Sequence, residues 1–130
     1  MSFNVRKLPC EPITVYTAQS SDLDHMEQNN QIMLDMLDQL SAPVFHIADM
    51  RPIKLNVDSL MQLAASVAYG EHSVLRHPMI KELILVTDSR LIAMAGDGLS
   101  SDIYGNLPVK IFGSLDEALQ YARAQIGQTR

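Results

Sequence analysis

Two almost continuously apolar runs constrain the fold of this chain more than any other feature of its sequence. They are PVFHIADM, at residues 43–50, and KELILVT, at residues 81–87. A strand with one face in water alternates apolar and polar residues, whereas a strand of a parallel sheet is covered on both faces and is apolar throughout. The two runs therefore predict central strands of an α/β fold.

Two further runs predict outer strands of the same sheet. PITVYTAQ (residues 12–19) has the residue types that strands favour, and LPVKIFG (residues 107–113) precedes the last helical pattern. In front of them, FNVRKL (residues 3–8) is compatible with an extra edge strand that pairs as a hairpin. Pro9 and Pro12 in the connection lack a ladder donor, so we expect this edge to be irregular.

Four helical patterns alternate with these strands. The first begins near Asp22, the second spans about residues 58–69, and the third spans about residues 89–104. The fourth follows Ser114, which forms a capping box with Glu117 three residues later. This order predicts a single α/β domain over residues 1–130, with a mostly parallel sheet of four to five strands and four helices.

The charge balance argues against two classes of partner. The chain carries a formal charge of −5 and has a pI near 5.2, whereas nucleic acids and anionic membranes require a basic face. The start, MSFNVRKLPCEPI, has no apolar stretch behind its positive charges, so we expect neither a signal peptide nor a transmembrane helix. These features predict a cytoplasmic protein that binds neither nucleic acid nor membrane.

Metal-ligating residues are few and unsuitably spaced. Cys10 is the only cysteine, which excludes an intramolecular disulfide and a multi-cysteine zinc site. The four histidines show no HxH or HxxxH spacing; they are His25, His46, His72 and His77. We therefore expect no metal and no cofactor.

Polar residues that follow the predicted central strands are the candidate site residues. Asp49 ends one such strand, and Asp88 and Ser89 follow another. Ligands of open α/β sheets bind at the carboxyl ends of the strands, so these three residues are candidates for a ligand-binding edge. Asp58 and Ser59, at the start of the second predicted helix, are either a helix cap and its neighbour or a functional pair.

The sequence resembles the STAS family, whose fold is that of the sporulation anti-sigma-factor antagonists. The resemblance rests on a strand of the VFHIAD type followed by a helix that starts near an Asp-Ser pair, and on the final unit LPVKIFGSLDEAL. It covers roughly residues 10–126. The stretch RHPMIKELILVTDS is more similar still to a SpoIIAA-like subgroup of small bacterial proteins.

The resemblance implies a phosphorylation switch. In well-studied members, a serine at the start of the second helix, preceded by an acid, is phosphorylated by a partner kinase, and phosphorylation releases the partner. That serine corresponds to Ser59, and the acid corresponds to Asp58. The chain departs from the family motif directly afterwards, because Leu60 and Met61 stand where the family has a second serine and a glycine.

Two functions remain open from the sequence. The first is a non-enzymatic regulatory or protein-interaction module, with a working surface from Arg51 to Ser66 and with a homodimer also compatible. The second is a domain that binds a small apolar or nucleotide ligand near Asp49, Asp88 and Ser89. An enzyme is not expected, since no nucleophile is paired with a base and no two carboxylates have a catalytic spacing.

Overall fold

A computed structural model of the chain describes residues 4–17, 19, 26–52, 77–90, 93–94 and 109–128. In chain order, its elements are β1 (Val5–Lys7), β2 (Ile13–Thr17), α1 (Met26–Asp38), β3 (Val44–Asp49), β4 (Ile80–Val86), β5 (Val109–Phe112) and α4 (Leu115–Gln128). The two runs that were expected to be central form β3 and β4, and the prediction of an α/β fold is confirmed.

The five strands form one sheet in the order β1-β2-β3-β4-β5. The pairs β2–β3, β3–β4 and β4–β5 are parallel. The pair β1–β2 is antiparallel, with Val5 opposite Tyr16 and Lys7 opposite Thr14. The sheet is therefore mixed, which corrects the expectation of a mostly parallel sheet.

The antiparallel edge follows from the short connection at residues 8–12. Parallel neighbours need a crossover of about a dozen residues or more, which this connection cannot supply. The N–H of Leu8 donates to the carbonyl of Ile13 at 2.9 Å, which closes the hairpin. The reversal passes through Cys10, whose φ of 61° lies in the left-handed region that non-glycine residues rarely adopt.

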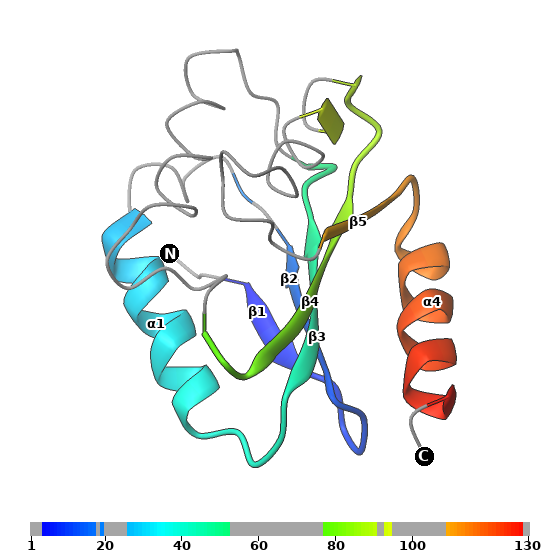
Figure 1. Cartoon of the computed structure of the whole chain (residues 1–130). Helices are drawn as coiled ribbons and strands as arrows, with labels where there is room; N and C mark the ends of the chain where they lie inside the picture. The colour runs from blue at the N-terminus through cyan, green and yellow to red at the C-terminus, as the bar shows by residue number, and fades with distance from the viewer. Residues whose placement is uncertain are drawn as a thin grey trace.

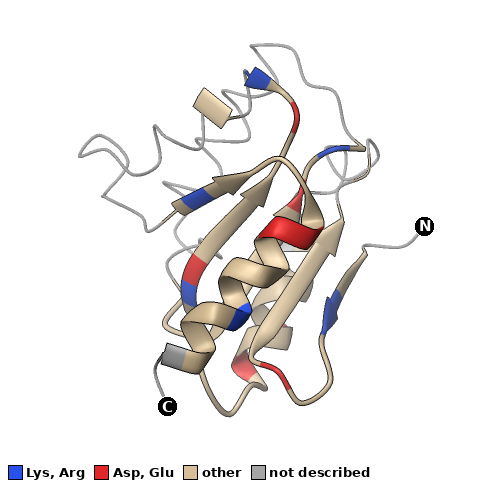
Figure 2. Ribbon diagram, turned by 90° about the vertical axis from the view of Figure 1, so that its right-hand side faces the viewer, with Lys and Arg blue, Asp and Glu red and all other residues tan. Residues whose placement is uncertain are grey.

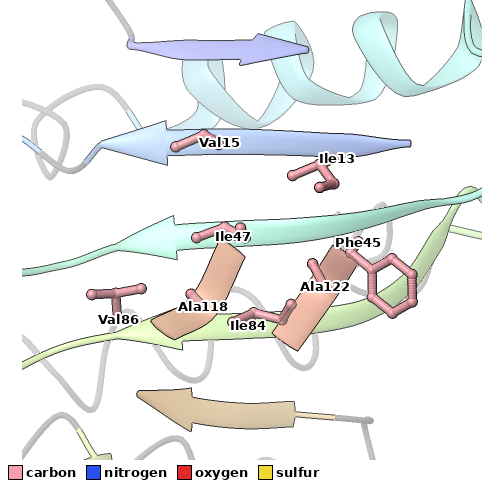
Figure 3. Packing of buried hydrophobic residues seen from close by; sticks show 8 residues of the cluster. All are labelled: Ile13, Val15, Phe45, Ile47, Ile84, Val86, Ala118 and Ala122. Carbon is pink, nitrogen blue, oxygen red and sulfur yellow. The ribbon is translucent and has the colours of Figure 1, made fainter. Parts of the chain in front are cut away.

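Helices lie on both sides of the sheet, with α1 on one face and α4 on the other (Figure 1). On the α4 side, alternating residues of β2, β3 and β4 pack against two alanines that lie one helical turn apart (Figure 3). This cluster consists of Ile13, Val15, Phe45, Ile47, Ile84, Val86, Ala118 and Ala122. On the other side, Met33 and Leu37 of α1 pack against Val44.

The helix content of the described residues differs from the expectation of four helices. Two helices are present in them, α1 and α4. The second predicted helix, at residues 58–69, lies outside the described residues. Of the third, at residues 89–104, the described part shows helical conformation at Arg90, Ala93 and Met94, and the Ala93 N–H donates to the Ser89 carbonyl at 3.0 Å.

The start of α4 agrees with the capping box in the sequence. The Ser114 hydroxyl oxygen accepts a hydrogen bond from the Glu117 N–H at 3.2 Å. The acids Asp116 and Glu117 lie in the first turn, where the positive end of the helix dipole favours negative charge. The helix therefore begins at the carboxyl end of β5, beside the ends of the other parallel strands (Figure 1).

Candidate functional site

The carboxyl ends of the parallel strands meet at one edge of the sheet. Thr17 of β2 lies opposite Asp49 of β3, and Asp49 lies opposite Val86 of β4. Side chains alternate along a strand, so Asp49 follows Phe45 and Ile47 on the face that packs against α4. The last residue of the central strand is therefore an acid that lies between two other strands.

Asp49 is held by Arg51, two residues further along the chain. The Arg51 guanidinium donates from Nε to Oδ1 of Asp49 at 2.9 Å and from Nη2 to Oδ2 at 2.8 Å. The backbone N–H of Arg51 also donates to Oδ1, at 3.1 Å. Asp49 is only 4% exposed, whereas the Arg51 side chain is 39% exposed. The guanidinium of Arg51 is thus held by a buried carboxylate, while part of the Arg51 side chain is at the surface.

The ionisation of this pair reflects the same contacts. Burial raises the pKa of Asp49, but the hydrogen bonds and the positive charge of Arg51 outweigh burial and hold that pKa below its ordinary value. The pKa of Arg51 is raised, first by its hydrogen bonds to Asp49 and then by the charges of Asp49, Asp88 and Asp116. Both groups are therefore charged at neutral pH.

A buried threonine shapes the segment after β4. Thr87 is 5% exposed, and its hydroxyl oxygen accepts a hydrogen bond from the Ser89 N–H at 3.0 Å. Its own N–H donates to the carbonyl of Phe112 in β5 at 3.0 Å, which fastens the two strand ends together. Asp88, which lies between Thr87 and Ser89, is exposed. The turn at residues 87–89 therefore leaves Asp88 exposed to solvent.

Among the residues that the structure describes, negative charge predominates at this edge of the sheet. Arg51 interacts electrostatically with three acids, which belong to the end of β3, the turn after β4 and the first turn of α4. Figure 2 shows the acidic first turn of α4 beside the strand ends. Arg51 is balanced by Asp49, so among the described residues here the three exposed acids Asp88, Asp116 and Glu117 outnumber the one remaining exposed cation, Arg90.

The structure brings together three of the predicted site residues. Asp49, Asp88 and Ser89 all lie at the carboxyl edge of the sheet. Asp58 and Ser59 lie outside the described residues. The part that sequence reasoning missed is the pairing of Arg51 with Asp49, although an arginine two residues after a buried strand-end acid was a usable signal.

The two described histidines have separate structural partners. The Nδ1 atom of His46, which is 5% exposed, lies 2.8 Å from the Thr14 hydroxyl oxygen. His77 Nε2 lies 2.8 Å from Oδ1 of Asp38, and its Nδ1 accepts from the Met79 N–H at 3.0 Å. Within the described ranges, no three His, Cys, Asp or Glu residues are grouped so as to hold a metal ion.

The opposite end of the sheet carries a second arginine–carboxylate pair. Arg123 of α4 donates to Glu11 in the β1–β2 connection, from Nε at 2.8 Å and from Nη2 at 3.2 Å. Both side chains are more exposed than Asp49, at 52% for Arg123 and 32% for Glu11. A hollow of about 250 Å³ lies beside this pair and is also lined by Cys10, Pro12 and Ile126.

Among the residues that the structure describes, no helix is both long and apolar enough to cross a bilayer.

Comparisons with known proteins identify the fold. No protein-family model matches the chain. No curated protein matches it either. Among solved structures, the chain is similar to an uncharacterized protein of the DUF3478 family with a SpoIIAA-like fold from Shewanella loihica PV-4, at 12% identity and a TM-score of 0.56. The match covers 93% of this chain and 92% of that one. It confirms the fold resemblance seen in the sequence: this chain has a SpoIIAA-like fold.

Proposed function

We propose that the chain is a single-domain, non-enzymatic regulatory module of the cytoplasm that binds a partner protein at the carboxyl end of its sheet. The proposed surface comprises Arg51, Asp88 and the segment at residues 53–66, which contains Asp58 and Ser59. Its support is the SpoIIAA-like fold together with the charged, partly exposed groups at this edge.

The observation that carries the proposal is the pairing of Asp49 with Arg51. A carboxylate that binds a small ligand must offer free lone pairs, but Arg51 already donates three hydrogen bonds to Asp49, which has about four acceptor sites. Removing the guanidinium would leave a buried charge without a counter-ion, so exchange for a ligand group is costly. This edge is therefore better suited to surface recognition than to enclosing a ligand.

Charge defines the kind of partner that fits. The exposed carboxylates of Asp88 and of Asp116, in the first turn of α4, act electrostatically on the guanidinium of Arg51. A partner with Lys or Arg side chains at its contact surface would complement this edge and would associate faster at low salt. A second copy of this chain would bring the same acids together, so a homodimer through this edge is disfavoured.

Phosphorylation of Ser59 is the proposed means of regulation. A phosphate carries a charge of about −1.5 to −2 at neutral pH. At a packed contact, such a charge without a counter-ion must be desolvated or left unpaired, so it would weaken the complex, which agrees with release on phosphorylation as the family resemblance implies.

The alternative is a small-ligand domain that uses Asp88 and Ser89. It is favoured by the exposure of the Asp88 carboxylate next to the start of a helical turn. In that case an apolar or nucleotide ligand, as expected from the sequence, would be bound without a protein partner.

Affinity capture from the source cells tests the proposal and separates it from the alternative. The tagged chain is compared with Asp88→Lys and with the control Asp35→Lys, which reverses an exposed acid on α1. Mass spectrometry then identifies the retained protein and any phosphosite. We expect one protein to be retained by the parent and by Asp35→Lys and lost from Asp88→Lys. Equal retention by all three variants would contradict the proposed surface.

A further inference from the structure

We draw no further inference here: the strongest candidate, the hollow between the β1–β2 connection and the end of α4 that Cys10 lines beside the Glu11–Arg123 pair, rests on a lone cysteine, and nothing in the described part of the chain shows which ligand would occupy it.

Discussion

The carboxylate of Asp49 and the guanidinium of Arg51 form a bidentate ion pair at the end of the central strand, with N–O distances of 2.9 and 2.8 Å. The acid is buried and the arginine is partly exposed. The pair therefore connects the interior of the fold to the surface that we propose for partner binding. It fixes the direction of the chain where residues 50–52 leave the sheet.

Replacing Arg51 should destabilise the fold more than replacing Arg123. Arg51→Gln removes the counter-ion of a buried carboxylate, and leaving such a group unsatisfied costs about 1–3 kcal/mol of unfolding free energy. Arg123→Gln breaks a pair of the same geometry in which both side chains are considerably exposed, so its effect should be much smaller. Urea denaturation of both variants measures the difference. Equal midpoints would mean that Asp49 does not need Arg51.

The buried imidazole of His46 predicts a specific loss of stability in acid. Burial lowers the pKa of His46 from 6.5 to about 4, so between these values the unfolded chain binds a proton that the folded chain does not. Its contribution is complete above pH 6.5 and declines as the pH falls toward 4. The total loss is about 3 kcal/mol.

The pH effect is measured by denaturant unfolding at a series of pH values in His46→Gln and in Thr14→Val. His46→Gln should lose less stability than the parent between pH 6.5 and 4, because it has no ring to protonate. Thr14→Val removes the hydrogen-bond partner but keeps the ring, so its pH slope should resemble that of the parent. If His46→Gln and the parent show the same slope, His46 is not the group responsible.

Metal removal should leave the protein unchanged. The chain has one cysteine, and within the described ranges no three potential ligands are grouped for a metal ion. A structural metal would contribute its binding energy to folding, so chelation would lower the thermal midpoint by many degrees. We expect equal midpoints with and without EDTA. A large drop would reveal a site that involves residues outside the described ranges.

The central strands were predictable because burial on both faces of the sheet requires apolar residues at successive positions. All six residues of β3 are buried, and burial on both faces requires the continuous apolar run that identified the strand. The start of α4 was also predictable, since a capping box depends on two residues three positions apart, here Ser114 and Glu117. The sequence was compatible with the hairpin at β1 but did not determine it, because β1 is only three residues long and mostly exposed.

The site was less predictable because its contacts depend on where elements meet. An acid two residues before an arginine is common at surfaces, and only the packing of α4 over β3 makes Asp49 a buried partner of Arg51. Likewise, His77 and Asp38 are 39 positions apart and are joined where the end of α1 meets the start of β4. The His77–Asp38 pair follows no local rule of spacing, and the spacing of Asp49 and Arg51 does not by itself distinguish a buried pair from an exposed one.

The most direct test of the proposed partner surface is the affinity of the purified partner for Ser59→Asp. An acid is favourable in the first turn of a helix, so in the predicted helix at residues 58–69 this change should alter the unfolding free energy by less than about 0.5 kcal/mol. It should nevertheless weaken the complex about tenfold or more, since a charge placed in the interface without a counter-ion must be desolvated or left unpaired. Ser59→Ala should bind as the parent does and should carry no phosphate at that position. A folded Ser59→Asp protein that binds the partner as tightly as the parent would contradict the account.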